Sequence, residues 1–312
     1  MDLRQLKYFV RIVELGGLSA AAQSLHVAQP SLSQHVANLE AELGLPLLER
    51  GARGARPTPA GRRLYEQAKA LLRQAGDIPA LVRQEGGEVA GHVRLGLPAS
   101  TARRVAVPLL RALREAHPGV TLEIVEGSTA YIAEMLQRHL LDLGVAVHPG
   151  DDARLDVHPL VTEELMLVGP PGDVPPGPVE VAVAVAQLAT LPLLLPAFPN
   201  AIRVRIEQLC NAAGLRYRLV AESAAAQVMV ATAQAGIAWT ILPWSAFEHE
   251  DPASLSWRPI AGRAFTRTLA VCGSRAAAGQ PAGEAVRQQL QAVVAAMLAE
   301  GGWPQAELPA RR

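Results

Sequence analysis

Residues 19–40 read SAAAQSLHVAQPSLSQHVANLE, and this stretch decides the fold of the first part of the chain. The pattern predicts two short helices, one from an N-cap at Ser19 to about Leu25 and one from Gln29-Pro30 onward. The small residues 20–22 let the second helix cross the first closely. A helix-turn-helix of this kind places the start of its second helix against DNA bases. An ordinary helical hairpin with a solvated face is the alternative.

The second helix is polar on one face and apolar on the other. The apolar face carries Leu32, Val36, Leu39 and Leu43. The polar face carries Gln29, Ser31, Ser33, Gln34, His35 and Asn38. Glutamine and asparagine pair with adenine through two hydrogen bonds, and serine bonds bases or phosphates. The polar face therefore has the chemistry needed to read DNA.

The residues on either side extend this unit. An amphipathic helix with Leu6, Phe9 and Val10 precedes it and ends at Gly16-Gly17. After it, residues 47–50 and 56–58 flank a turn and predict a small β-hairpin. Residues 50–73 hold seven Lys or Arg against one acid, Glu66. A basic hairpin beside a helix-turn-helix fits contact with phosphates.

A long helix is expected to begin at Thr58-Pro59, with Thr58 as N-cap. Its apolar residues form a near-heptad stripe, which favours pairing with a second helix. The stripe consists of Leu64, Ala68, Leu71, Leu72, Ala75, Ile78, Leu81 and Val82. Pro79 lies within the helix and is expected to kink or break it.

From residue 92 onward, strands alternate with helices, which predicts an α/β region with mainly parallel sheets. The expected strands are 92–97, 120–125, 143–147, 164–168, 191–195, 237–242, 255–260 and 268–272. The expected helices are 103–117, 129–139, 202–213, 224–235 and 283–300.

Length and composition bound the class of protein. A chain of 312 residues with 50% hydrophobic residues and 19% charged residues suggests two or three folded domains. Two cysteines, Cys210 and Cys272, cannot form a disulfide framework, and a signal peptide and a membrane span are not expected. We expect a cytoplasmic protein that does not contact a membrane. No enzyme motif occurs and the eight histidines are scattered, so we expect no cofactor and no metal site.

Two longer segments carry a resemblance to a known family. Residues 3–50 read LRQLKYFVRIVELGGLSAAAQSLHVAQPSLSQHVANLEAELGLPLLER, and residues 57–64 read PTPAGRRL. These segments resemble the LysR-type transcriptional regulators. The resemblance implies a winged helix-turn-helix at 1–58, a dimerising linker helix at 59–88 and a regulatory domain at 89–302. That domain would be bilobed and similar to periplasmic solute-binding proteins, with subdomain I at 89–162 and 267–302 and subdomain II at 163–266.

The same resemblance implies site residues. The base-reading residues would be Gln29, Pro30, Ser33 and Gln34, while Ser31 and Arg50, with Arg53 or Arg56 in the wing, would approach phosphates. A ligand between the subdomains would meet Ser100, Thr101, Ser128, Thr129, Phe198, Asn200, Trp239 and Thr240.

The expected function is that of a regulator that binds double-stranded DNA sequence-specifically. Because Ser100-Thr101 and Ser128-Thr129 precede predicted helices, we expect a small anionic effector, either a carboxylate or an inorganic oxyanion. These residues are otherwise plain helix caps. The resemblance implies a homodimer or homotetramer, and RNA polymerase is a further candidate partner. The alternatives are a small-molecule-binding protein or enzyme on the same bilobed fold, or a regulator without an effector.

Overall fold

The structure is a computed structural model that describes residues 1–51, 54–82, 89–147, 149, 154–172, 182–261, 265–274 and 280–309. Arg53 lies outside the described residues. The chain divides into two compact units, which we consider separately. We name them after the functions expected from the sequence: the DNA-binding unit comprises residues 1–87 with 137–140, and the regulatory unit comprises residues 88–136 with 141–312.

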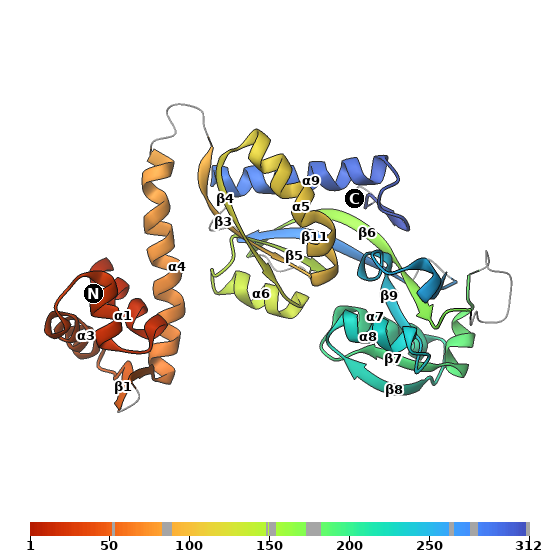
Figure 1. Cartoon of the computed structure of the whole chain (residues 1–312), viewed down its shortest axis with the longest axis horizontal. Helices are drawn as coiled ribbons and strands as arrows, with labels where there is room; N and C mark the ends of the chain where they lie inside the picture. Colours follow the sequence, from red (N-terminus) through yellow and green to blue (C-terminus); the bar gives the residue numbers. More distant parts are fainter. Residues whose placement is uncertain are drawn as a thin grey trace. The chain divides into compact units, whose positions relative to one another are not determined.

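The DNA-binding unit contains four helices and a two-stranded hairpin in its described part (Figure 1). They are α1 (Leu3–Leu15), α2 (Leu18–Leu25), α3 (Gln29–Leu43), β1 (Leu48–Gly51), β2 (Gly54–Pro57) and α4 (Pro59–Val82). Helix α1 begins with a capping box at Asp2 and ends at Gly16 in the left-handed conformation, as the glycine pair predicts. Helix α2 begins at Leu18 with Gly17 as its N-cap, two residues before the expected N-cap, so the prediction of Ser19 as N-cap is wrong.

The core of this unit lies among α1, α2, α3 and the hairpin. Leu32, Val36 and Leu39 are fully buried, which confirms the apolar face of α3. Leu43, by contrast, is 40% exposed because it lies in the last turn of the helix. The hairpin is anchored by the amide of Ala55, which donates to the carbonyl oxygen of Gly16.

Helix α4 begins as its cap residues predict. The hydroxyl of Thr58 accepts a hydrogen bond from the amide of Gly61 at 2.9 Å. The helix runs on to Val82, so Pro79 does not break it. Leu64 and Leu72 pack against the core of the DNA-binding unit, whereas Leu71 and Ile78 are 44% and 54% exposed. The predicted stripe is therefore divided between an internal contact and a free apolar surface.

The first half of the regulatory unit is a sheet with helices on both faces (Figure 1). Its strands are β3 (Ala90–Leu97), β4 (Gly119–Glu126), β5 (Leu143–Val147), β6 (Leu155–Gly169), β11 (Thr266–Ser274) and β12 (Ala306–Glu307). Helices α5 (Ala99–Ala116) and α9 (Pro281–Ala299) pack on one face. Helix α6 (Thr129–Gln137) packs on the other, where it covers Ala146 and Cys272.

The second half is built around the end of β6. Its strands are β7 (Pro192–Pro196), β8 (Arg218–Ser223), β9 (Thr240–Pro243) and β10 (Ser256–Pro259). Helix α7 (Ala201–Ala212) packs in one apolar cluster and α8 (Ala226–Gln234) in another. Its described residues also form three short 3₁₀ helices: η2 (Val185–Thr190), η3 (Trp244–Ala246) and η4 (Pro252–Ser254).

The sheets are mixed, so the prediction of mainly parallel sheets is only partly right. Strands β4, β3 and β5 are parallel neighbours, and so are β7 and β8. Strands β9, β10 and β11 all run antiparallel to β6. Strand β6 is 15 residues long, against five expected, because it crosses from one half to the other.

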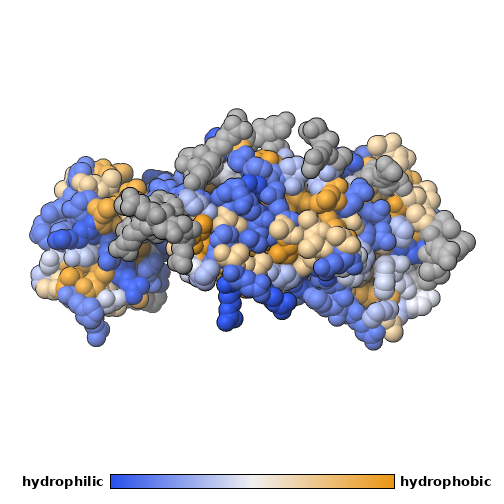
Figure 2. All heavy atoms as spheres, turned by 90° about the horizontal axis from the view of Figure 1, so that it is seen from above, coloured by the Kyte–Doolittle hydropathy of each residue, from blue (hydrophilic) through white to orange (hydrophobic). Residues whose placement is uncertain are grey.

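No helix in the described part of the chain is both long and apolar enough to span a membrane. The face drawn in Figure 2 intermixes hydrophilic and hydrophobic residues.

Candidate DNA-binding surface and ligand cavity

The first turns of α3 present the predicted base-reading residues to solvent. Gln29, Pro30, Ser31 and Gln34 are exposed, and Ser33 is half-buried. Pro30 occupies the first turn, where its missing amide hydrogen breaks no helical hydrogen bond. Because Leu32 and Val36 bury the opposite face, these polar side chains form an outward surface at the start of the helix.

Arg50 of the wing lies against this surface. Its Nη1 donates to the hydroxyl oxygen of Ser33 at 2.9 Å, and its side chain is 44% exposed. Glu40, near the end of α3, fixes the wing because its Oε1 accepts from the amides of Leu47 and Leu48 at 2.7 and 3.1 Å. Sequence analysis did not identify Glu40, since its partners are backbone amides that only the folded hairpin brings within reach.

Other polar residues of the surface bond one another. Ser19 donates to Oε1 of Gln29 at 3.1 Å, and Nε2 of Gln34 donates to Asn38 at 2.8 Å. Arg56 on β2 is exposed. Gln29 and Gln34 are thus oriented by neighbours while their amide groups stay at the surface.

The regulatory unit contains a cavity of about 340 Å³ between its two halves. Its polar side chains include Ser100, Glu126, Ser128, Thr129, Asn200, Ser223 and Arg267. Its apolar side chains include Val147, Pro196, Pro199, Met229, Leu242 and Ala246. The cavity therefore joins a polar wall to an apolar one.

Four of the eight predicted effector residues line this cavity: Ser100, Ser128, Thr129 and Asn200. Thr101, Trp239 and Thr240 are buried and do not belong to the lining. Trp239 packs in the apolar cluster beneath α7, against Gly169. Phe198 is 57% exposed and stacks on the guanidinium of Arg203 instead. The sequence therefore predicted the neighbourhood of these four residues. It did not show which side chains point into the cavity, because that depends on packing.

Four helices begin at the cavity. The serine–threonine motifs at 100–101 and 128–129 predicted two of them, α5 and α6. The lining includes residues 98–100 of α5, 128–130 of α6, 200–202 of α7, and 224 and 226 at the start of α8. The first turns of α5 and α8 have no side-chain cap. Each helix N-terminus carries a partial positive charge and amide donors, so their convergence favours an anion.

The hydroxyls are partly used within the fold. Ser128 caps α6, as the alternative interpretation expected, and Asn200 caps α7. Thr129 accepts from the amide of Val147 at 3.2 Å, which leaves its hydroxyl hydrogen to donate. Ser100 lies inside the first turn of α5 rather than before the helix, so it is not a cap.

Arg267 is the functional candidate that sequence analysis missed. It lies on β11, lines the cavity and is 4% exposed. Its Nε donates to Glu163 at 2.6 Å, and its Nη2 donates to Ser100 at 2.9 Å. Its Nη1 makes no hydrogen bond with the described residues. Glu163 is its direct cross-strand neighbour, which no local pattern reveals because the two residues are 104 positions apart.

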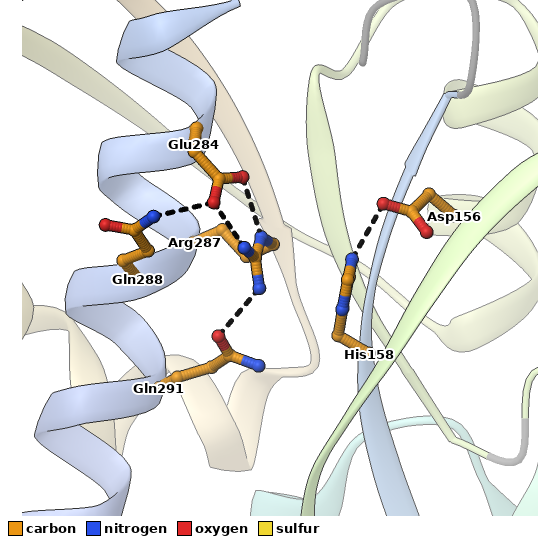
Figure 3. Close-up of polar contacts among 6 residues, drawn as sticks. All are labelled: Asp156, His158, Glu284, Arg287, Gln288 and Gln291. Carbon is orange, nitrogen blue, oxygen red and sulfur yellow. Dashed lines mark hydrogen bonds and ion pairs between the residues drawn. The ribbon is translucent and has the colours of Figure 1, made fainter. Parts of the chain in front are cut away.

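Titratable groups outside the cavity form separate clusters. On α9, Arg287 donates to Glu284 and Gln291 and faces β6, where Asp156 pairs with His158 (Figure 3). Burial raises the pKa of the Cys272 thiol to about 11, so little of the reactive thiolate forms at neutral pH. No group of three or more potential metal ligands gathers within the described ranges.

Comparisons with known proteins agree with this architecture. The family described as "Bacterial regulatory helix-turn-helix protein, lysR family" matches residues 3–62, and the "LysR substrate binding domain" matches residues 86–295. The chain belongs to the LysR family of transcriptional regulators. This LysR regulator is 35% identical over 305 residues to the nitrogen assimilation regulatory protein nac of Escherichia coli, covering 96% of this chain and 97% of that one.

Solved structures share the fold of this LysR regulator. A full-length OxyR variant from Pseudomonas aeruginosa superposes with a TM-score of 0.72 at 25% identity, covering 94% of each chain. Full-length CbnR in complex with its target DNA gives a TM-score of 0.71 at 24% identity, covering 94% of this chain and all of that one. The relatives are regulators rather than enzymes. Proteins of this family regulate transcription by binding DNA, and they carry an effector-type domain.

Proposed function

We propose that this regulator reads its operator with the first turns of α3. Gln29, Ser33 and Gln34 contact base edges and Pro30 packs against them, while Ser31, Arg50 and Arg56 contact phosphates. The observation that carries this proposal is the exposure of Gln29, Ser31 and Gln34 at the start of a helix whose other face is buried. From its position in the sequence, Arg53 is a further basic residue of the wing that contacts phosphates.

The test compares Gln29→Ala with Gln67→Ala, an exposed glutamine on α4, on an operator selected from random-sequence DNA and on non-operator DNA. Gln29→Ala is expected to lose discrimination by about 1–3 kcal/mol, the value of a good base contact. Arg56→Ala is expected to weaken binding to both DNAs and to lower the salt dependence. Unchanged discrimination in Gln29→Ala contradicts the assignment of α3.

The cavity of the regulatory unit binds a small anion in this proposal, either a carboxylate or an inorganic oxyanion. Four helix N-termini surround it and face one exposed carboxylate among the described lining residues, Glu126. Arg267, which is paired with the buried Glu163, adds hydrogen-bond donors to the lining. The apolar wall at Met229, Leu242 and Ala246 favours a ligand with a hydrocarbon portion over a bare ion.

A thermal-shift screen of small carboxylates and oxyanions at constant ionic strength tests this site. Any hit is repeated on Ser100→Ala and Thr129→Val, with Thr232→Val on α8 as a control outside the lining. Stabilisation is expected to fall in the first two variants and to persist in the third. A hit that survives in all three lies elsewhere, and no hit supports a regulator without an effector.

The free part of the α4 stripe supports a homodimer or a dimer of dimers. Leu71 and Ile78 expose large apolar side chains, whereas Leu64, Ala68 and Leu72 of the same helix pack against the core. Leu71→Asp is expected to give smaller species in analytical ultracentrifugation, while Gln67→Asp on the same helix leaves assembly unchanged. An unchanged oligomer in Leu71→Asp rules out pairing through this surface.

A further inference from the structure

The segment after α9 packs against the strand that joins the two halves of the regulatory unit. The amide of Glu164 donates to the carbonyl oxygen of Gln305 at 2.8 Å. Strand β12 then pairs with β6, with Ala306 opposite Glu163. The end of the chain thus reaches the part of β6 that carries the carboxylate partner of Arg267.

Trp303 lies in this segment, before β12, and is 2% exposed. Its Nε1 donates to Oε1 of Glu163 at 3.0 Å. Its ring lies 5.6 Å from the guanidinium of Arg104, and Trp244 lies 5.2 Å from the same guanidinium. Arg104 also forms an ion pair with the buried carboxylate of Glu248. Trp303 therefore contacts two buried ion pairs, one through its N–H and one through its ring.

Glu163 connects Trp303 to the cavity. It is 1% exposed and accepts hydrogen bonds from three side chains: Arg267, Ser245 at 2.7 Å, and Trp303. A buried carboxylate stays charged only when donors surround it. The cation that lines the cavity and the indole of the C-terminal segment consequently share one acceptor.

We propose that Trp303 is a positioning residue of the ligand cavity, which acts on Arg267 through Glu163. The proposal rests on the anion site described above. An anion in the cavity competes with Glu163 for the Arg267 guanidinium. When the guanidinium turns toward the anion, Glu163 keeps the hydroxyl of Ser245 and the indole N–H. Without the indole N–H, Glu163 retains one neutral donor and holds Arg267 more strongly, so the anion binds less well.

The first test needs no ligand and uses tryptophan fluorescence. Trp303→Phe keeps a ring beside Arg104 and removes the N–H that Glu163 accepts, together with the rest of the pyrrole ring. Arg267→Gln is expected to shift the emission spectrum when Trp303 is present and to leave it unchanged in the Trp303→Phe background. Arg267→Lys, which keeps the charge but replaces the planar guanidinium by a compact ammonium, serves if Arg267→Gln fails to fold. An equal spectral change in both backgrounds overturns the coupling.

The second test titrates sodium sulfate and sodium butyrate at constant ionic strength and follows the thermal midpoint. Trp303→Phe is expected to weaken binding about tenfold, as for loss of a hydrogen bond to a charged group. The matched control is Trp244→Phe, which alters the other ring beside Arg104 and is expected to bind as the wild type does. Equal binding by Trp303→Phe and wild type overturns the proposal. If the wild type binds neither anion, the anion site is wrong, whereas the fluorescence test still decides the coupling.

Discussion

Arg50 of the DNA-binding unit and Arg267 of the regulatory unit each donate to a serine, yet they are held in opposite ways. Arg50 is 44% exposed and its nearest carboxylate oxygen, on Glu40, lies 4.0 Å away. Arg267 is 5% exposed and lies 2.5 Å from a carboxylate that is itself buried. The surface proposed to meet DNA therefore holds a half-exposed cation with a distant carboxylate. The cavity holds a buried cation that a buried carboxylate neutralises.

This difference has an energetic consequence. Exposed ion pairs contribute about 0–1 kcal/mol, because water screens them and the side chains lose entropy. Removing one partner of a buried pair costs about 3–5 kcal/mol, because an uncompensated charge remains. Variants of Arg50 and Arg267 therefore test whether the buried ion pair contributes more to the free energy of unfolding than the exposed one.

The largest effect is expected for Arg267→Met, which leaves Glu163 without its cation. We expect a loss of about 3–5 kcal/mol in the free energy of unfolding, measured by urea denaturation. All four tryptophans lie in the regulatory unit, so their fluorescence reports its unfolding. Arg50→Met, followed by circular dichroism, is expected to lose less than about 1 kcal/mol. Equal losses contradict the comparison.

A smaller effect is expected at the wing. Gly54 has φ +106°, and a Cβ atom there would lie 2.2 Å from the carbonyl oxygen of Gly16. Because backbone atoms cannot move aside as a side chain can, Gly54→Ala is expected to cost about 2 kcal/mol and to weaken DNA binding. Gly51→Ala in the same hairpin meets nothing within 4 Å and is the control. A stable Gly54→Ala variant would show that the wing is less firmly seated than its contacts indicate.

An effect of intermediate size is expected for the hydrogen bond that Glu207 on α7 accepts from the hydroxyl of Tyr217. This hydrogen bond, followed by those from Arg203, lowers the pKa of Glu207, while burial and Glu207 raise the pKa of Tyr217 to about 12. A lowered carboxyl pKa stabilises the fold above the unfolded pKa of about 4.3, and this stability is lost as pH falls through the folded value. Tyr217→Phe is expected to cost about 1 kcal/mol at pH 7 and less at pH values near 3. Thermal midpoints at both pH values measure this, and a pH-independent loss contradicts the assignment.

The smallest effect is expected for Arg287→Met on α9 (Figure 3). Hydrogen bonds from Arg287 lower the pKa of Glu284, but that carboxylate is 44% exposed. Solvent screening should limit the loss to about 0.5 kcal/mol, again only above the unfolded carboxyl pKa. A loss as large as that of Arg267→Met would show that exposure does not decide the energy of these pairs.

Local patterns predicted the helices of the DNA-binding unit well because each begins or ends at a residue with a strong preference. Gly16, Pro30 and Thr58 occupy the positions that their chemistry favours. The error at Ser19 has a local cause, since the extended Gly17 serves as N-cap one residue before Leu18. Strand β8 escaped prediction because all of its residues but the last are exposed, so no apolar pattern marks it.

The sequence by itself therefore determined the family, most of the order of helices and strands, and the polar face of α3, since these depend on residues close together in the chain. The tertiary structure alone decided which side chains line the cavity. Thr101 and Thr240 point into the core, whereas Arg267 reaches the cavity from a strand paired with β6. Cross-strand register and packing of four helix ends bring these groups together, and neither leaves a periodic signal in the sequence.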